Sequence, residues 1–427
     1  MSFSGFALDD RLQRAVEAAG YTEATPIQEA AIPPGLEGRD LIGTAQTGTG
    51  KTAAFVLPML QSLLTKPGAR GRTRALIVTP TRELAEQVHA MVRQLAQFTK
   101  LRSATVYGGV GYEPQTKALR NGTEIIVACP GRLLDHVGRG NAKLGSVEVL
   151  VLDEADRMLD MGFLPSVREI VALTPRERQT TLWSATFARE LDELAAQVLR
   201  RPQRLEVGLT APPATVEHTL CPVDHRQKTE LLLRLLKESD TASVLIFTRT
   251  KHRADRLAAQ IKRSGYRTAV LHSNRTQSQR QQALDGFRSG RYDLLVATDI
   301  AARGLDIETI SHVINYDMPS TADDYIHRIG RTGRAERNGD ALTLVTADDC
   351  ATVLDIERAL GEPLAVRETE GFTYGAPTFA GSGGFRGGRR ANTPTSYHSR
   401  PTRPSYGGSK RVSRGGARPP AARSRAR

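Results

Sequence analysis

The chain has 427 residues, 39% of them hydrophobic and 25% charged, which is enough for two or three domains with substantial cores. No apolar run approaches the roughly 18 residues of a membrane-spanning helix, and the first residues lack the basic and apolar segments of a secretory signal. The three cysteines, Cys129, Cys221 and Cys350, lie too far apart for a disulfide framework or a metal cluster. We therefore expect a cytoplasmic protein without a membrane segment.

The positive charge is concentrated at one end of the chain. The formal net charge is +13, but residues 371–427 carry eleven arginines, one lysine and no acidic residue. The remainder holds 47 basic residues against 46 acidic ones, so the body is nearly neutral. The basic segment is rich in Gly, Arg, Ser and Pro and too poor in aliphatic residues to form a core, which predicts a disordered tail.

The body shows the rhythm of an α/β protein. Short β-branched runs alternate with amphipathic stretches, the pattern of a parallel sheet covered by helices. A segment of small residues and prolines at 208–216 interrupts this pattern and predicts a linker between two domains, 1–207 and 217–370. The predicted strands are 75–79, 124–128, 147–152 and 180–184 in the first domain, and 243–248, 294–297, 313–315 and 341–345 in the second.

A candidate phosphate-binding loop follows a short apolar segment and opens a helical stretch. Its residues are Ala45, Gln46, Thr47, Gly48, Thr49, Gly50, Lys51 and Thr52. In such a loop the backbone N–H groups surround the phosphates, the lysine reaches the outer phosphates and the Thr hydroxyl ligates Mg²⁺. The usual pattern begins with Gly where this chain has Ala45. A Gly/Thr turn that merely precedes a helix is the alternative.

An acidic quartet ends a strand-like run about a hundred residues later. Asp153, Glu154, Ala155 and Asp156 follow a run of Val and Leu, and the carboxyl end of a buried strand is where α/β sheets bind ligands. Asp153 would hold Mg²⁺ through a water molecule, and Glu154 would orient or deprotonate the attacking water. Acidic residues that only favour a helix N-terminus are the alternative.

With these motifs the chain resembles the DEAD-box RNA helicases, and in particular the bacterial RhlE-type group, over residues 3–366. Residues 20–28 resemble the family's Q motif, with Phe3 at the usual upstream aromatic position. The Gln28 amide can pair with N6–H and N7 of adenine, which would select ATP. Phe3 and Tyr21 would stack near the base, with ordinary aromatic packing as the alternative.

The resemblance also implies roles in hydrolysis and coupling. Ser184 and Thr186 match the motif that couples hydrolysis to strand separation, together with Asp156 and with His327, which would bridge to the acidic quartet. Arg331 and Arg334 match the arginine fingers that stabilise charge on the γ-phosphate, and Asp306 falls where the family contacts the ribose. The implied fold is two tandem RecA-like domains with parallel sheets.

Further motifs fall where the family binds the RNA backbone. The first-domain residues are Pro80, Thr81, Arg82, Gly108, Gly109, Pro130, Gly131 and Arg132, and the second-domain residues are Thr248, Arg249, Gln277, Arg280, Thr298 and Gly304. Each alone would more often be a solvated loop residue, but their order favours an RNA track. Cys129 and Ser273 replace the usual Thr and Gly, so we expect slightly looser RNA binding.

The predicted function is an ATP- and Mg²⁺-dependent RNA helicase that unwinds short duplexes and remodels RNA–protein complexes with little sequence preference. Arginines and aromatic residues in the tail would tether RNA, with a merely solubilising tail as the alternative. Ribonucleoprotein or RNA-degradation partners fit this function. A DNA helicase, and an RNA chaperone in which hydrolysis only resets binding, are the rival functions.

Overall fold

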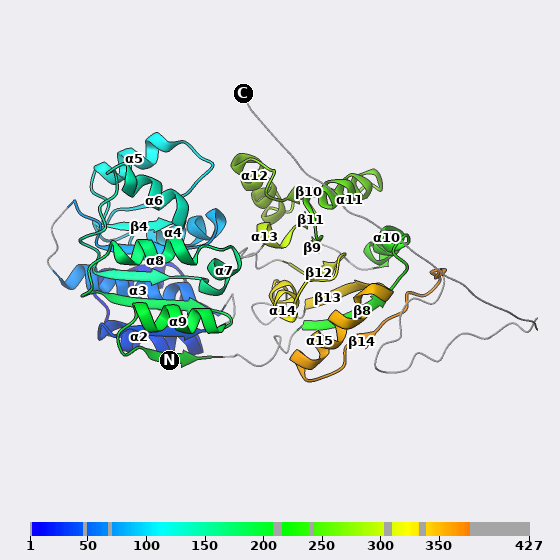
Figure 1. Ribbon diagram of the computed structural model, residues 1–427, viewed down its shortest axis with the longest axis horizontal. Helices are drawn as coiled ribbons and strands as arrows, with labels where there is room; N and C mark the ends of the chain where they lie inside the picture. The colour runs from blue at the N-terminus through cyan, green and yellow to red at the C-terminus, as the bar shows by residue number, and fades with distance from the viewer. Residues whose placement is uncertain are drawn as a thin grey trace, which may run out of the picture. The chain divides into compact units, whose positions relative to one another are not determined.

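The structure is a computed structural model that describes residues 2–45, 49–66, 71–207, 216–238, 243–302, 310–332 and 339–375 (Figure 1). The described residues form two α/β domains. The elements of the first are η1 (Phe3–Gly5), α1 (Asp10–Ala18), α2 (Pro26–Leu36), β1 (Leu41–Thr44), α3 (Lys51–Thr65), β2 (Ala75–Val78), α4 (Arg82–Leu95), β3 (Ser103–Val106), α5 (Tyr112–Arg120), β4 (Ile125–Ala128), α6 (Pro130–Gly138), β5 (Val149–Leu152), α7 (Ala155–Asp160), α8 (Leu164–Ala172), β6 (Gln179–Ser184), α9 (Arg189–Val198) and β7 (Gln203–Glu206).

The second domain repeats this alternation. Its elements are β8 (Val216–Pro222), α10 (Lys228–Glu238), β9 (Val244–Phe247), α11 (Lys251–Arg263), β10 (Thr268–Leu271), α12 (Gln277–Arg288), β11 (Leu294–Ala297), α13 (Asp299–Ala302), β12 (His312–Asn315), α14 (Ala322–Ile329), β13 (Gly339–Val345), η2 (Ala347–Asp349), α15 (Cys350–Leu360) and β14 (Ala365–Val366).

Each domain is built on a parallel sheet of seven strands in the described residues. The strand orders are β3-β4-β2-β5-β6-β1-β7 and β10-β11-β9-β12-β13-β8-β14. Numbered within its own domain, the second order is the same as the first, so the two domains share one topology. This confirms the predicted fold class of two RecA-like parallel sheets.

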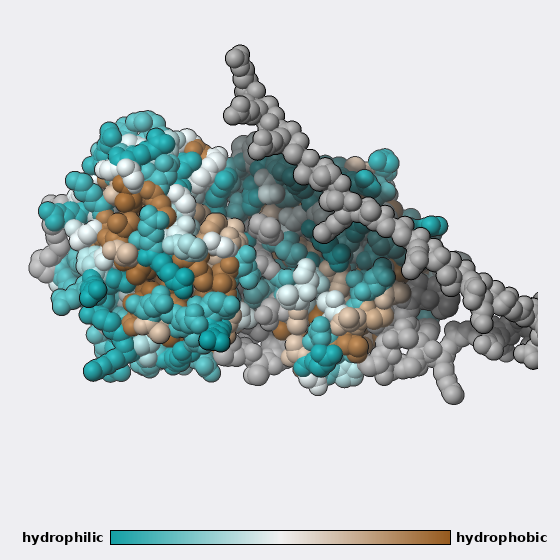
Figure 2. Space-filling model, in the orientation of Figure 1, coloured by the Kyte–Doolittle hydropathy of each residue, from teal (hydrophilic) through white to brown (hydrophobic). Residues whose placement is uncertain are grey.

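Both faces of each sheet are covered by helices, because successive residues of a strand point to opposite faces and both sets are apolar. In β2, Ile77 lies in a buried cluster with residues of α1 to α4, whereas Leu76 and Val78 lie in a second cluster with residues of α5 to α9. In the second domain, α12 to α15 cover one face, and α10 and α11 cover the other. On the face shown in Figure 2, hydrophilic and hydrophobic residues are interspersed over the first domain.

All eight predicted strands overlap strands of the structure, but β1, β3, β7, β8, β10 and β14 were not predicted. Most of these are short or carry polar residues, for example Gln203–Glu206 at the edge of the first sheet. The first residues of the predicted tail are described. Phe372 packs against the core of the second domain, and Tyr374 Oη accepts a hydrogen bond from the Thr369 N–H (2.7 Å). Residues 376–427 lie outside the described residues.

Neither sheet is accompanied by a membrane helix: among the described residues, no helix is long and apolar enough to cross a bilayer. The three cysteines predicted to be unpaired are free thiols.

One glycine fixes the strand that leads into the phosphate-binding loop. Gly43 of β1 lies beside Trp183 of β6, and the Trp183 side chain is fully buried. A Cβ atom at Gly43 would lie 2.3 Å from two ring carbons of Trp183, well inside van der Waals contact. The indole therefore occupies the space that any side chain at position 43 would need.

Gly43→Ala should lower the free energy of unfolding by about 1–3 kcal/mol or more, because the added methyl group overpacks a rigid ring in the core. Chemical denaturation of full-length protein measures this loss. Gly145→Ala is the matched control, since its Cβ would meet no atom within 4 Å. Equal midpoints for the two variants would contradict the packing argument.

Candidate nucleotide and RNA sites

The strand order sorts the sequence motifs into two groups at one edge of the first sheet. The phosphate-binding loop follows β1, the acidic quartet follows β5 and Ser184 ends β6, and these three strands are neighbours. Gly108 and Gly109 come after β3, Pro130 to Arg132 after β4, and Pro80 to Arg82 after β2, which are also neighbours. Because parallel strands end at the same edge, the candidate ATP residues and the candidate RNA residues occupy adjacent halves of it.

The described part of the phosphate-binding loop is closed by Lys51. Its Nζ donates a hydrogen bond to the Ala45 carbonyl (2.7 Å) across the loop. Gly50 has φ of 92°, a left-handed conformation that favours glycine, and directly precedes α3. Lys51 and Thr52 therefore lie at the N-terminus of a 15-residue helix, where N–H groups and the helix dipole favour anions. Gln46, Thr47 and Gly48 lie outside the described residues.

The Q-motif glutamine is bonded directly to this loop. Gln28 Oε1 accepts a hydrogen bond from the Thr25 N–H (2.9 Å), and Gln28 Nε2 donates to the Gly50 carbonyl (3.1 Å). The Thr25 hydroxyl donates to the Thr49 carbonyl (2.7 Å). An amide oxygen accepts two hydrogen bonds and an amide nitrogen donates two, so each atom retains capacity for an adenine edge. Gln28 thus joins the start of α2 to the phosphate-binding loop.

The two aromatic residues predicted near the base are packed in the structure. Phe3 is buried in the core, with its ring centre 5.7 Å from that of Phe6 and 5.5 Å from that of Tyr21. Tyr21 is partly buried, and its hydroxyl donates to Met91 Sδ (3.4 Å). These contacts match the aromatic packing that the sequence left as the alternative for both residues.

The three carboxylates of the acidic quartet, Asp153, Glu154 and Asp156, are all buried, and Glu154 has a strained backbone. Burial raises the pKa of Asp153 to about 7, while the nearby Lys51 ammonium opposes this shift. Glu154 has φ of 50° and ψ of 56°, a left-handed conformation that is unusual for a residue with a side chain. Its Oε2 accepts a hydrogen bond from Arg157 Nη1 (3.1 Å). Such backbone strain at the end of a buried strand is typical of functional sites.

Asp156 ties the acidic quartet to the Ser184–Thr186 segment. Its Oδ2 accepts hydrogen bonds from the backbone N–H groups of Ala185 (2.9 Å) and Thr186 (3.1 Å). The Asp156 N–H donates to Ser184 Oγ (3.3 Å), which itself donates to the Thr186 carbonyl (2.5 Å). Asp156, Ser184 and Thr186, three of the residues predicted to couple hydrolysis to strand separation, therefore form one hydrogen-bonded unit.

Several first-domain candidates for RNA binding lie close to the glycine pair Gly108 and Gly109. Gly109 has φ of +81°, and a Cβ there would lie 1.9 Å from Arg82 Nη1, so the Arg82 guanidinium lies directly over it. Arg132 Nη1 donates to the Val110 carbonyl (3.4 Å). Thr81 caps α4 by accepting a hydrogen bond from the Leu84 N–H. Pro80, Gly108, Pro130 and Gly131 adjoin these residues in the chain.

In the second domain the RNA candidates follow strands at the same sheet positions as in the first domain. Gln277 and Arg280 follow β10, Thr298 follows β11, and Thr248 and Arg249 follow β9. These three strands correspond in sheet position to β3, β4 and β2. The coupling candidate His327 and the catalytic candidate Arg331 come after β12 instead, and Arg331 Nε donates to the His327 carbonyl (3.1 Å). Gly304, Asp306 and Arg334 lie outside the described residues.

The site residues fit ATP with Mg²⁺. Among the described residues, no three His, Cys, Asp or Glu side chains form a metal-binding group. Mg²⁺ at a nucleotide is held by one or two protein ligands together with phosphates and water, so a dedicated cage is not required. The buried Asp153 carboxylate and the Thr52 hydroxyl at the start of α3 are suitable ligands.

Comparisons with known proteins agree with this geometry. Residues 25–194 match the DEAD/DEAH box helicase family, and residues 227–336 match the helicase conserved C-terminal domain. The chain is 42% identical to the ATP-dependent RNA helicase SrmB of Escherichia coli over 86% of its own length and 83% of SrmB. The chain belongs to the DEAD-box family of ATP-dependent RNA helicases.

Other relatives differ more in length or sequence. DEAD-box ATP-dependent RNA helicase 28 of Oryza sativa is 44% identical over 86% of this chain, but the chain spans only 46% of that protein. The structure of S. cerevisiae Dbp5 bound to RNA and ADP BeF3 superimposes with a TM-score of 0.79 and 31% identity, covering 86% of this chain and 96% of Dbp5.

Several polar residues of this helicase were not predicted from the sequence. Glu83 accepts a hydrogen bond from Arg280 Nε (2.8 Å), and Arg82 Nη1 donates to Gln277 Oε1 (3.4 Å). Arg328, adjacent to His327, is buried and holds both carboxylate oxygens of Asp299 (2.6 and 2.8 Å). Acidic residues next to recognised motifs were the available signal for these partners.

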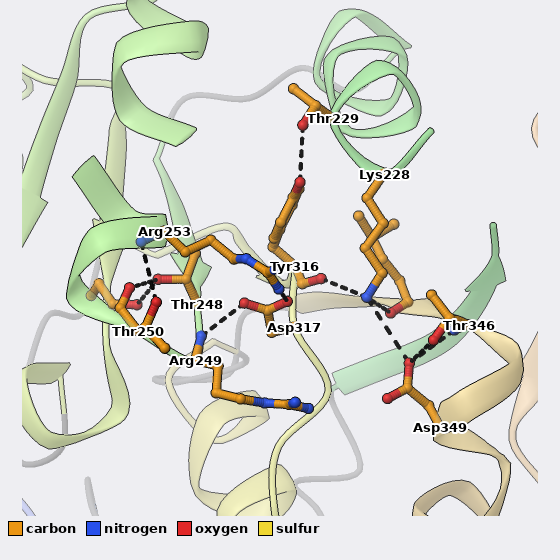
Figure 3. A network of polar contacts seen from close by, with 12 residues as sticks. Lys228, Thr229, Thr248, Arg249, Thr250, Arg253, Tyr316, Asp317, Thr346 and Asp349 are labelled. Carbon is orange, nitrogen blue, oxygen red and sulfur yellow. Dashed lines mark hydrogen bonds and ion pairs between the residues drawn. The ribbon is translucent and has the colours of Figure 1, made fainter. Parts of the chain in front are cut away.

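Asp317 is the unpredicted residue that positions the RNA candidate Arg249 (Figure 3). Its Oδ2 accepts a hydrogen bond from the Arg249 N–H (2.9 Å), and its Oδ1 pairs with Arg253. The Asp317 side chain is only 4% exposed. The loop after β9 is therefore held by a buried carboxylate that follows β12.

Lys228 holds the Tyr316–Asp317 turn that follows β12 (Figure 3). Its buried Nζ donates to the carbonyls of Tyr316 (3.1 Å), which directly follows β12, and Leu344 (3.2 Å), which lies in the neighbouring strand β13. Burial lowers the pKa of the Lys228 ammonium, and Asp349, 4.0 Å away, opposes that shift. The Tyr316–Asp317 turn is thereby fixed at its backbone.

Asp317→Asn should lower the free energy of unfolding by roughly 1.5–3 kcal/mol and weaken RNA binding, because Arg249 and Arg253 lose a charged acceptor. Chemical denaturation and RNA titration of the full-length protein measure the two effects. Asp293→Asn is the control, since Asp293 is 26% exposed and pairs with an exposed Arg267, an ion pair worth about 0–1 kcal/mol. Parental RNA affinity in a folded Asp317→Asn variant would argue against a positioning role.

Proposed function

We propose that this DEAD-box protein hydrolyses ATP, with Mg²⁺, to unwind short RNA duplexes and remodel RNA–protein complexes with little sequence preference. The observation that carries the proposal is the sorting of motifs along one sheet edge. Lys51, Asp153 and the Asp156-bound Ser184–Thr186 segment follow three neighbouring strands, and the RNA candidates follow the next three. Hydrolysis of the bound nucleotide would thus take place beside the loops proposed to bind RNA.

Each residue of the nucleotide site has a proposed task. Lys51 would exchange the Ala45 carbonyl for phosphate oxygens, since both are acceptors for its ammonium. Thr52 and Asp153 would hold Mg²⁺, which neutralises charge that develops on the phosphates. Glu154 would orient the attacking water and accept its proton. Arg331 and Arg334, with His327, would complete the site from the second domain.

The RNA candidates suit the sugar–phosphate backbone rather than the bases. Arg82, Arg132, Arg249 and Arg280 provide guanidinium groups, and Gly108 and Gly109 permit close approach. Backbone contacts carry no sequence information, so binding should tolerate many RNAs. The basic tail, outside the described residues, would tether flanking RNA by charge and stacking.

We also propose membership of the bacterial RhlE-type group, a cytoplasmic location, and partners from ribonucleoprotein or RNA-degradation complexes. The complete motif series and the Arg/Gly-rich tail support the group. Free cysteines suit a reducing compartment.

Glu154→Gln should retain binding of ATP and RNA but lose about 10²–10⁴-fold in ATP turnover, because the Mg²⁺ ligands remain while the proton acceptor is removed. RNA should also leave the ATP-bound variant more slowly than it leaves the parent. Filter binding of RNA gives the off-rate, and Glu193→Gln on the exposed surface of α9 is the control. If RNA leaves the variant as fast as it leaves the parent, Glu154 is not the residue that activates the attacking water. If the variant unwinds RNA as well as the parent does, the rival function of an RNA chaperone is favoured.

Gln28 should make ATP a better substrate than GTP. Loss of the paired adenine contact in Gln28→Ala should cost about 1–3 kcal/mol, or roughly 5- to 150-fold in discrimination. Comparing kcat/KM for ATP and GTP at saturating RNA measures this, with thermal unfolding to monitor the lost Gly50 contact. Discrimination that survives in Gln28→Ala would assign base selection to other residues.

A further inference from the structure

A stacked pair of aromatic rings, Tyr112 and His136, adjoins the RNA candidates Gly108, Gly109 and Arg132 of the first domain. Tyr112 begins α5, and its ring lies parallel to that of His136 of α6, with ring centres 4.1 Å apart and planes 16° apart. His136 is fully buried, and neither of its ring nitrogens has a hydrogen-bond partner within the described residues. Burial, and then the charge of Arg132, lower the pKa of His136, so the ring is neutral at pH 7. It acts as a flat support for Tyr112.

Two arginines gather at the supported ring. The guanidinium carbon of Arg132 lies 5.2 Å from the Tyr112 ring centre, and that of Arg139 lies 4.6 Å from it. Both distances lie within the range of cation–π attraction. Arg132 and Arg139 come from the two ends of α6, so one ring brings together two charges that the helix alone would keep apart.

The charge of this cluster is only partly balanced. Arg139 pairs with Asp135 (3.0 Å), but these side chains are 63% and 41% exposed, and such pairs contribute little. Arg132 donates to the Val110 carbonyl, which carries no net charge. Two guanidinium groups and one solvated carboxylate leave the cluster with a net positive charge. A bound anion would reduce the repulsion between the two guanidinium groups.

The cluster continues the row of RNA candidates. A Cβ on Gly108 would lie 3.6 Å from Arg82 Nη2 and 3.9 Å from Arg132 Nη2, so both arginines approach the same glycine. Arg132 therefore joins Arg82 and Gly108 on one side to Tyr112 and Arg139 on the other. None of the helicase motifs identified in the sequence includes Tyr112, His136 or Arg139.

We propose that Arg139, held with Arg132 against the Tyr112 ring, forms an additional binding subsite for the RNA backbone that lengthens the first-domain track by one phosphate. Tyr112 and His136 are positioning residues in this subsite, and Arg139 contacts the phosphate. The inference rests on the RNA track proposed above. It predicts that the footprint on RNA extends past the motif that ends at Arg132.

The test is a salt titration of binding between the full-length protein and single-stranded oligo-U, in the presence of a non-hydrolysable ATP analogue. Arg139→Gln should weaken binding about threefold to fivefold, as for an exposed ion pair. The slope of log K against log salt should fall by about 0.7, the value for one phosphate contact on a single strand. The control is Arg189→Gln, because Arg189 forms a similar exposed pair with Glu193 on α9. It should change neither quantity.

Variants of Tyr112 test whether its ring positions Arg139 for RNA binding. Tyr112→Phe removes a buried hydroxyl that has no hydrogen-bond partner among the residues the structure describes, so this variant should bind RNA as the parent does. Tyr112→Leu should weaken binding and lower the salt slope, and adding Arg139→Gln to it should cause little further loss, because the two changes remove one interaction. A Tyr112→Leu variant with a lower unfolding temperature but a parental salt slope would show that Tyr112 does not position Arg139 for RNA binding.

Arg132→Gln separates this inference from the proposed function. If Arg132→Gln weakens binding while Arg139→Gln behaves like Arg189→Gln, the RNA track stands and the additional subsite is wrong. If Arg132→Gln also binds as the parent does, the first-domain RNA track itself fails.

Discussion

The constraint on which the rest of this structure depends is that parallel strands end at one edge of their sheet. A parallel pair needs a crossover connection, so each strand returns to the same side and delivers its following loop there. In the first domain this brings loops separated by over a hundred residues, such as those after β1 and β5, to neighbouring positions. Strand order thereby decides which chemistry adjoins which.

The same partition occurs in both domains. The loops after the first three strands of each sheet order carry RNA candidates. Lys51, Asp153, His327 and Arg331 come after strands that lie later in the order, whereas Asp306 comes after β11 in the chain. For the described residues, the boundary falls between β2 and β5 in one sheet and between β9 and β12 in the other. A common topology therefore places corresponding motif-bearing loops at corresponding positions of the two sheets.

Buried carboxylates join the loops that follow neighbouring or nearby strands of each sheet. Asp156 joins the loop after β5 to the backbone after β6, and Asp317 joins the loop after β12 to the backbone after β9. A buried charge is retained only when hydrogen bonds satisfy it, and here the donors are backbone N–H groups of adjacent motifs. Displacement of one loop must consequently move its neighbour or break costly bonds.

The sequence by itself determined the fold class, the motif series and the family, because β-branched runs, glycine loops and acidic strand ends are local patterns. Its strand prediction failed at elements such as β1, where a glycine interrupts a run of four residues. The packing of Phe3, the bonds of Gln28 to the loop and the role of Asp317 were decided by the tertiary structure. The Phe3 and Gln28 contacts depend on how η1 and α2 pack, and the Asp317 contact depends on β12 lying beside β9. No local pattern encodes these arrangements, because they arise from pairing and burial between residues far apart in the chain.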